Sequence, residues 1–178
     1  MVNDHVTAYV GIGSNLGDRA GNLLLAVRGL VEASFQVTKL SAVYETAPVG
    51  IEGASSFLNM AAEIKVAGIT STQMLARMLR IEYLLGRTDK SQKKPRTIDL
   101  DLLFFGQEHL ESEFLTIPHP RAHLRRFVLV PLNEICPTYQ HPLLHKDIAA
   151  LLSECDDTSA VVRWYPHSRE GIHVSQSG

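Results

Sequence analysis

The feature that most constrains this chain is the stretch Pro95–Phe105, which reads PRTIDLDLLFF. Its β-branched, aliphatic and aromatic residues, bounded by a proline and by Gly106, predict a strand. Because alternate side chains of a strand share a face, Asp99 and Asp101 point to the same side, about 7 Å apart along the strand. The opposite face receives Ile98, Leu100 and Leu102.

Two carboxylates on one face of a half-buried strand are costly unless a cation joins them. A solvated strand face with two exposed acids is the alternative interpretation. The apolar run Leu102–Phe105 carries the strand into a core, and Arg96 stands just before the acids. Paired aspartates beside an arginine suit a Mg²⁺-bound polyphosphate, so we predict a metal site at Asp99 and Asp101.

Composition limits the class of protein. The 178 residues, 45% hydrophobic and 20% charged, suffice for one domain with a real core. The net charge of −2 argues against a dedicated nucleic-acid binder. No apolar run approaches the length of a membrane span. Cys136 and Cys155 form neither a disulfide framework nor a CxxC pair, and the N-terminus lacks a signal-peptide pattern, so we expect a cytoplasmic protein.

Hydrophobic periodicity predicts the order of the elements. The expected strands are Val6–Gly13, Phe35–Thr46, Phe57–Val66 and Pro95–Phe105, and the expected helices are Arg19–Val31 and Thr70–Leu85. This βαββαβ order is the ferredoxin-like α+β arrangement, with helices packed on an antiparallel sheet. C-terminal additions follow, including short helices at Leu132–Cys136 and His145–Leu152. We expect one domain over residues 1–155, then an extension over 156–178 with an edge strand at Ala160–Tyr165 and a loose tail.

Residues that flank the acidic strand support a phosphate site. Arg87 opens a lysine-rich loop that ends at Arg96, and this loop is either a solvated surface run or a lid over a bound anion. His119 lies in a proline-bracketed turn before Arg125, which favours a phosphate contact over a purely structural role. The GIGSNLG motif (Gly11–Gly17) lacks the GxGxxG spacing and the parallel βαβ unit of a dinucleotide site, so it predicts a close strand-to-helix turn.

Two aromatic residues can be interpreted in two ways, and the sequence does not decide between them. Phe57 and Phe127 fit a hydrophobic core, and they equally fit stacking on a flat heterocycle. Asn59 shares the strand face of Phe57 and would lie beside such a ring.

Together these motifs resemble the 6-hydroxymethyl-7,8-dihydropterin pyrophosphokinase family. The matching pieces, in family order, are Gly11–Asp18, Tyr44–Gly50, Phe57–Asn59, Glu82 with Gly86–Arg87, Pro95–Asp101, and Ile117–Arg121 with Arg125, Phe127 and Pro131–Leu132. The resemblance implies transfer of the β,γ-pyrophosphoryl group of ATP to the pterin hydroxymethyl oxygen, with release of AMP, in folate biosynthesis. It also implies two Mg²⁺ ions bridged by Asp99 and Asp101. We expect a monomer that binds pterin and ATP, with no nucleic-acid or membrane partner.

The resemblance further implies roles for single residues. Catalysis would rest on the two aspartates with Arg87 and Arg96. The residues implied at the ATP phosphates are Arg87, Arg96, His119 and Arg125, and those near the rest of the nucleotide are Leu75, Leu102 and Thr116. The pterin would be sandwiched by Phe57 and Phe127, read at its polar edge by Asn59, and held by backbone groups of Thr46 and Val49. Two loops that match mobile lids are Gly50–Ser56 and Arg87–Lys94.

The chain departs from the family in the second of these lids. It lacks the tryptophan that many members carry there, and Asp89 takes the place of a frequent arginine. Nearby lysines lack the bidentate fork of arginine.

Two other functions fit parts of the sequence. A Mg²⁺-dependent nucleotidyltransferase also uses carboxylates on a strand, but it would release pyrophosphate and not AMP. A ferredoxin-like RNA-binding module would need exposed aromatic residues on its sheet, where this chain carries two acids.

Overall fold

Strands and helices follow one another in the order that the sequence predicts. A computed structural model describes residues 4–47, 55–86 and 97–166. Within these ranges the elements are β1 (His5–Ser14), α1 (Arg19–Glu32), β2 (Gln36–Leu40), β3 (Tyr44–Thr46), β4 (Phe57–Ala67), α2 (Ser71–Leu84), β5 (Asp99–Phe105), β6 (Leu110–Glu111), β7 (Thr116–Ile117), η1 (Ala122–Leu124), α3 (Arg126–Ile135), α4 (Ile148–Ser153) and β8 (Val161–Arg163).

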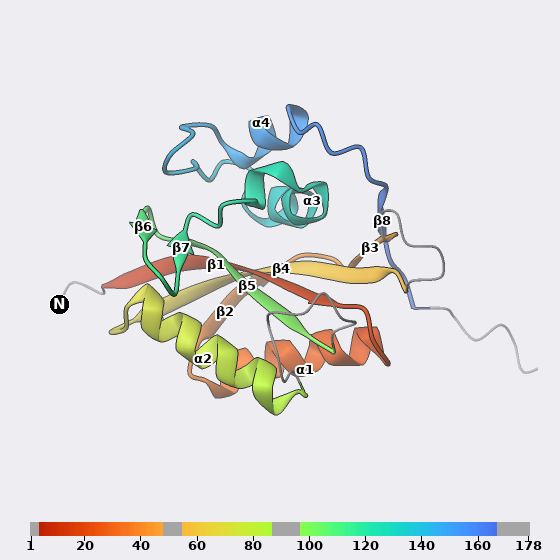
Figure 1. Cartoon of the computed structure of the whole chain (residues 1–178), viewed down its shortest axis with the longest axis horizontal. Helices are drawn as coiled ribbons and strands as arrows, with labels where there is room; N and C mark the ends of the chain where they lie inside the picture. Colours follow the sequence, from red (N-terminus) through yellow and green to blue (C-terminus); the bar gives the residue numbers. More distant parts are fainter. Residues whose placement is uncertain (1–3, 48–54, 87–96, 167–178) are drawn as a thin grey trace, which may run out of the picture.

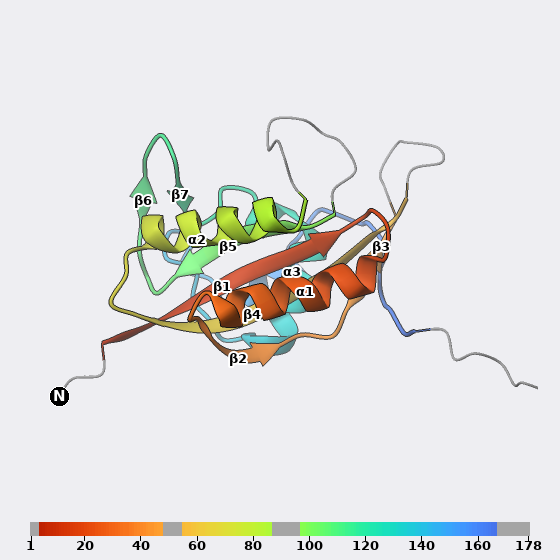
Figure 2. The ribbon, with the colours of Figure 1, turned by 90° about the horizontal axis from the view of Figure 1, so that it is seen from below.

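One antiparallel sheet organises the described part of the molecule. Its strand order is β5-β1-β4-β3-β8, and β2 also pairs with β4. Figure 1 shows the sheet nearly edge-on, with α1 and α2 on one face and α3 and α4 on the other. From below, α1 and α2 lie side by side along β1 and β5 (Figure 2). This arrangement confirms the ferredoxin-like α+β fold.

The predicted strand Phe35–Thr46 is wrong in one respect, because two strands occupy it. The break lies at Ser41, whose Oγ accepts a hydrogen bond of 2.8 Å from the Ala61 backbone N–H. The Ser41 backbone N–H in turn donates to the Ala61 carbonyl at 2.9 Å. A side chain therefore replaces part of the backbone ladder, and β2 and β3 pair separately with β4.

The two helices under the sheet are well defined at their starts and closely packed. Asp18 caps α1 by accepting from the Gly21 N–H at 3.0 Å, and Thr70 forms a capping box with Gln73 at the start of α2. A Cβ at Gly29 would lie 2.7 Å from the Ile81 side chain. Glycine at this position therefore lets α1 and α2 approach each other closely.

The C-terminal additions form a second layer. The helix α3 begins at Arg126, earlier than the predicted Leu132, and it contains Pro131. Proline cannot donate the helical hydrogen bond, but buried Leu129 and Leu132 pack this helix against the sheet. The last strand, β8, pairs with β3 inside the range where an edge strand is expected. No helix in the described ranges is long and apolar enough to cross a membrane.

Candidate active site

The two predicted metal ligands lie at the start of the edge strand β5. Asp99 and Asp101 are half-buried, whereas Leu100 and Leu102 between and after them are fully packed in the core with α1 and α2. The predicted alternation is therefore confirmed, although the strand begins at Asp99, and Thr97 and Ile98 lie outside it. Because the leucines face α1 and α2, both carboxylates face the side of the sheet that carries α3.

Two glycines separate these acids from the polar residues farther across the sheet. In the pairing register Asp99 lies opposite Gly13, and Gly13 lies opposite Asn59 on its other side. Asp101 lies opposite Gly11 in the same way. Directly paired residues share a face, so backbone alone lines the sheet between the acids and the amide. A Cβ at Gly13 would lie 2.7 Å from the Asn59 Oδ1, so the glycine makes room for the amide.

We call Gly11 and Gly13, which leave only backbone on this part of the sheet, the glycine floor. The residues predicted to bind the pterin lie next to it. Thr46 pairs with Phe57 in the register of β3 and β4, and Asn59 follows on the same face. The Thr46 side chain is buried, and within the described part of the chain its Oγ1 has no hydrogen-bond partner. A buried hydroxyl without a partner is costly, so this atom is suited to meet a polar group of a ligand. The remaining predicted contact, Val49, lies outside the described residues.

Both candidate stacking rings are only half-buried. Phe57 and Phe127 belong to neither of the two packed apolar clusters that make up the core. Phe127 stands at the start of α3, and the Arg125 guanidinium lies 5.7 Å from its ring centroid. Of the two interpretations that the sequence leaves open, this placement favours stacking on a ligand over core packing.

His119 lies close to the acids because its segment runs beside β5. Its backbone N–H donates to the Leu103 carbonyl at 2.9 Å, and its Nδ1 accepts from the Arg121 N–H at 3.1 Å. Burial, together with Arg125 and Arg121, lowers the pKa of His119 from 6.5 to about 4, and Asp99 opposes this shift. The ring is therefore neutral near pH 7. With Nδ1 accepting, Nε2 carries the proton and can donate to an anion.

The other residues that are predicted to contact the nucleotide do not gather at one place in the described part of the chain. Leu102 is buried toward α1 and α2, so a contact from this position would come from its backbone. Leu75 also packs partly against that core, and Thr116 is exposed on β7. Arg87 and Arg96, which are predicted to be catalytic, lie outside the described residues, as do most positions of the two expected lids. These roles stay predictions.

Sequence reasoning missed two groups of this site. One is the pair Gly11 and Gly13, because their Gly-x-Gly pattern by itself predicts only a close strand-to-helix turn. The other is the Thr46 hydroxyl, for which only backbone contacts were expected. The first was detectable from the period-2 spacing of Gly11 and Gly13, whereas the second needed the packing of the folded chain.

The carboxylates of Asp99 and Asp101 fit a Mg²⁺ site only if a bound ligand supplies further oxygen atoms. In the described ranges, no group of three or more His, Cys, Asp or Glu side chains is placed to hold a metal ion. A pair of half-buried carboxylates is the usual protein share at Mg²⁺ sites where substrate phosphates and water supply the other oxygens. The pair at Asp99 and Asp101 is consistent with this kind of site.

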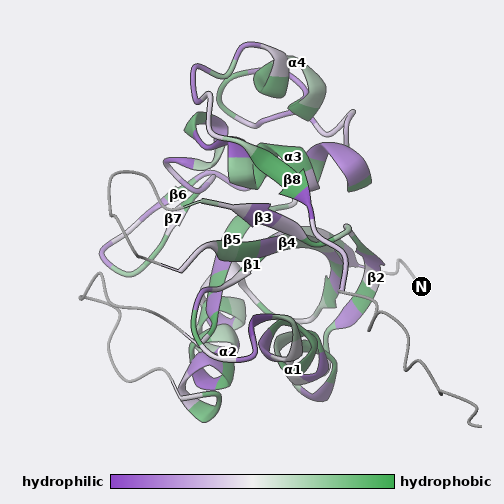
Figure 3. Cartoon of the chain, turned by 90° about the vertical axis from the view of Figure 1, so that its right-hand side faces the viewer, coloured by the Kyte–Doolittle hydropathy of each residue, from purple (hydrophilic) through white to green (hydrophobic). Residues whose placement is uncertain are grey.

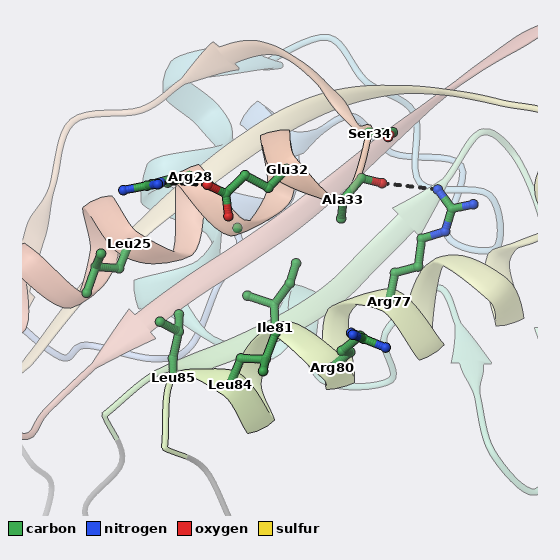
Figure 4. A pocket seen from close by; sticks show the side chains of 11 residues that line it. Leu25, Arg28, Glu32, Ala33, Ser34, Arg77, Arg80, Ile81, Leu84 and Leu85 are labelled. Carbon is green, nitrogen blue, oxygen red and sulfur yellow. Dashed lines mark hydrogen bonds and ion pairs between the residues drawn. The ribbon is translucent and has the colours of Figure 1, made fainter.

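A separate groove of about 500 Å³ lies between α1 and α2 (Figure 4). Its apolar side chains include Leu25, Ile81, Leu84 and Leu85, and its charged ones are Arg28, Glu32, Arg77 and Arg80. Arg28 is paired with Glu32 at 2.7 Å, and Arg77 donates to the Ala33 carbonyl at 3.1 Å. This groove lies on the helix side of the sheet, whereas the acids face the other side, so it does not belong to the candidate site.

Fold and site together define a ferredoxin-like domain with a carboxylate pair suited to metal-dependent chemistry on phosphates. A profile of the family described as 7,8-dihydro-6-hydroxymethylpterin-pyrophosphokinase (HPPK) matches residues 9–137. The chain belongs to this family.

Similar proteins agree with this assignment. The chain is 49% identical over 130 residues to the 2-amino-4-hydroxy-6-hydroxymethyldihydropteridine pyrophosphokinase of Bacillus subtilis, covering 72% of this chain and 77% of that protein. It is 34% identical to the enzyme of the same name from Aquifex aeolicus, covering 80% and 88%. The crystal structure of Plasmodium falciparum HPPK-DHPS has the same fold, with a TM-score of 0.68 at 18% identity. That match covers 86% of this chain but 43% of the Plasmodium chain.

Proposed function

We propose that the protein transfers pyrophosphate from ATP to 6-hydroxymethyl-7,8-dihydropterin, giving AMP and the pterin diphosphate in folate biosynthesis. Family membership supports the reaction. The observation that carries the site assignment is the row across the sheet, with Asp99 at one end, Gly13 in the middle and Asn59 at the other. This row supports the proposal of a polyphosphate site and a heterocycle site side by side on one face of the sheet.

The two ends of this row have different tasks. Mg²⁺ ions held by Asp99 and Asp101 would neutralise charge on the polyphosphate and make the pterin hydroxyl a better nucleophile. Asn59 presents an amide, which can both donate and accept, to the polar edge of the pterin. Phe57 and Phe127 hold the ring flat, so the hydroxymethyl group points toward the acids.

His119 and Arg125 contribute on the phosphate side. A neutral His119 donates a hydrogen bond from Nε2 without adding a full charge, and Arg125 supplies a permanent positive charge. Both act by orienting the chain of phosphates in line with the hydroxyl, which is the main protein contribution to this kind of transfer. Arg87 and Arg96 are proposed to close the site from the second lid.

We further propose that the protein acts as a cytoplasmic monomer that binds neither nucleic acid nor membranes. Cys136 and Cys155 are both free thiols, which is consistent with a reducing compartment. The net charge of −2 gives no basic excess for nucleic acid.

A product assay tests the reaction. The full chain is incubated with Mg²⁺, ATP and 6-hydroxymethyl-7,8-dihydropterin, and AMP, ADP and pyrophosphate are resolved. We expect AMP and pterin diphosphate in equal amounts, with no AMP when the pterin is left out. Pterin-independent release of pyrophosphate would support the nucleotidyltransferase alternative, and salt-sensitive RNA binding without turnover would support the RNA-binding module.

Replacement of one stacking ring tests the pterin end. In Phe127→Ala we expect the pterin affinity to fall about tenfold or more, because a stacking face is lost, while ATP affinity changes little. Phe35→Leu is the matched control, since Phe35 is a buried core ring on the α1 and α2 side. Binding of each substrate is measured separately by calorimetry. An equal loss for both ligands in Phe127→Ala would make Phe127 a structural residue.

A further inference from the structure

A buried carboxylate that the proposed reaction does not use lies directly behind the metal site. Glu82, in the last turn of α2, is 1% exposed. It is the one carboxylate among the fully buried side chains of the described ranges. Its Oε1 accepts a buried hydrogen bond of 2.7 Å from the backbone N–H of Leu100. Leu100 is the residue between the two acids, Asp99 and Asp101.

The position of this hydrogen bond follows from the sheet topology. The strand β5 is at the edge of the sheet and has a neighbour, β1, on one side only. In an antiparallel ladder alternate residues turn their backbone N–H groups away from the neighbouring strand. Leu100 has such an N–H group, because it donates to Glu82 on α2 and not to β1. Without this acceptor, the backbone between the two acids would be held from one side only.

The cost of burying Glu82 argues that this contact has a purpose beyond packing. Neighbouring positions on the same face of α2, Met74 and Met78, are apolar and fully buried. A buried carboxylate is far more costly than such a side chain, unless it is hydrogen-bonded and compensated. It also accepts a stronger hydrogen bond from an N–H group than a neutral oxygen does.

We propose that Glu82 is a positioning residue that sets the geometry of the metal site through the backbone of β5. By holding the Leu100 N–H, Glu82 fixes the peptide units on either side and therefore the directions of the Asp99 and Asp101 side chains. Groups that orient metal ligands without touching the metal tune its affinity in this way. The proposal rests on the proposed function of the two aspartates.

Two conservative variants separate position from charge. Glu82→Gln keeps the length and an oxygen acceptor but loses the charge. Glu82→Asp keeps the charge but is one methylene too short to reach the Leu100 N–H. Met78→Ala, one helical turn earlier on the same face of α2, is the control for simple loss of core packing.

Three measurements read out the proposal. The first is the affinity for Mn²⁺, used as a spectroscopic probe, in the presence of a non-hydrolysable ATP analogue. The second is the Mg²⁺ concentration at half-maximal rate, compared with KM for the pterin. The third is hydrogen exchange of the Leu100 amide, which reports the hydrogen bond itself.

We expect Glu82→Asp to weaken Mn²⁺ binding about tenfold, to raise the Mg²⁺ requirement similarly, and to speed exchange at Leu100, with KM for the pterin unchanged. Glu82→Gln should change all three less than Glu82→Asp does, because its neutral oxygen still reaches the Leu100 N–H but accepts a weaker hydrogen bond. Met78→Ala should lower thermal stability without changing the Mg²⁺ requirement. Unaltered metal binding in Glu82→Asp, or an equal loss in Glu82→Gln, would overturn the proposal. An unaltered chain that neither binds Mn²⁺ nor forms product would instead overturn the proposed function.

Discussion

The two faces of the same sheet carry different residues along β1 and at the start of β5. Toward α1 and α2, the central strands present an unbroken aliphatic layer, to which β1 contributes Ala8, Val10 and Ile12, all fully buried. Toward α3, the intervening residues of β1 include Gly11 and Gly13. Figure 3 shows both helix layers with the sheet between them, coloured by hydropathy. Because strand side chains alternate, a single strand can stabilise the fold with one face and serve chemistry with the other.

The α3 face is itself divided into two ends. At one end, which we call the apolar end, Tyr9 and Phe104 pack with Leu129 and Leu132 of α3 in a second apolar cluster. At the other end of β1, the glycines, the two acids and Asn59 have no place in either cluster. The difference shows that α3 packs on only part of this face, and that the polar part lies outside both apolar clusters.

The largest expected effect is a loss of turnover without a loss of stability when either of the two acids on β5 is replaced. Asp99→Ala and Asp101→Ala should each lower kcat by about 10³-fold, or about 4 kcal/mol, because a metal ligand is lost. Thermal unfolding should stay nearly unchanged, since both side chains are half-buried and outside the apolar clusters. Turnover and unfolding are measured on the same samples. Activity like that of the unaltered chain in either variant would contradict the metal assignment.

The residue between the acids should behave in the opposite way. Leu100 is fully buried on the α1 and α2 face, so Leu100→Ala should destabilise the protein by about 2–5 kcal/mol through lost burial and a cavity. The Mg²⁺ requirement should stay close to its normal value, because the backbone N–H that meets Glu82 is retained. Denaturant unfolding and Mg²⁺ titration of the rate test this. A large change in the Mg²⁺ requirement would mean that the two faces are not independent.

A smaller effect is expected from filling the glycine floor. In Gly13→Ala the new Cβ would displace the Asn59 amide, which lies 2.7 Å from its position. We expect KM for the pterin to rise about tenfold, the value of about one hydrogen bond. Asn59→Ala should have a similar effect, and the double variant should be no worse than Asn59→Ala alone. Fully additive effects would mean that Gly13 acts independently of Asn59.

The smallest expected effect is on the pH dependence of stability, and it concerns a histidine at the apolar end of the α3 face. His141 is buried against Phe104, with 5.5 Å between ring centroids, and its Nδ1 accepts from the Leu143 and Leu144 N–H groups at 3.2 Å. Burial, His123 and His145 lower its pKa from 6.5 to about 4. Between these values the unfolded chain binds more protons than the folded chain, so stability falls as the pH drops from about 6.5 to about 4.

Replacement of His141 by asparagine tests whether this histidine causes the loss of stability at low pH. In His141→Asn the Oδ1 can still accept from the two N–H groups, but the side chain no longer titrates. We therefore expect a shallower loss of stability over the same pH range, measured by urea unfolding at pH 7, 6, 5 and 4. An unchanged pH slope would mean that His141 is not a source of the acid sensitivity.

Much of this protein was predictable from local sequence pattern. The strand of Asp99 and Asp101, with its acidic and apolar faces, follows from period-2 alternation. The order of strands and helices follows from periodicity and caps such as Thr70 and Gln73. These features depend on residues that are near one another in the chain, so local rules describe them well.

Other features were decided only when distant segments met. The break between β2 and β3 depends on Ser41 meeting Ala61, and the early start of α3 depends on packing that tolerates Pro131. The altered pKa of His119 requires burial together with Arg125 and Arg121.

The contact between Glu82 and Leu100 shows the same division most clearly. The sequence by itself determined that two acids alternate with leucines on a strand. The tertiary structure decided that this strand lies at the sheet edge and that α2 brings a carboxylate to its outer N–H group. The physical reason is that hydrogen bonds and burial between distant residues depend on how the elements pack, which no local pattern encodes.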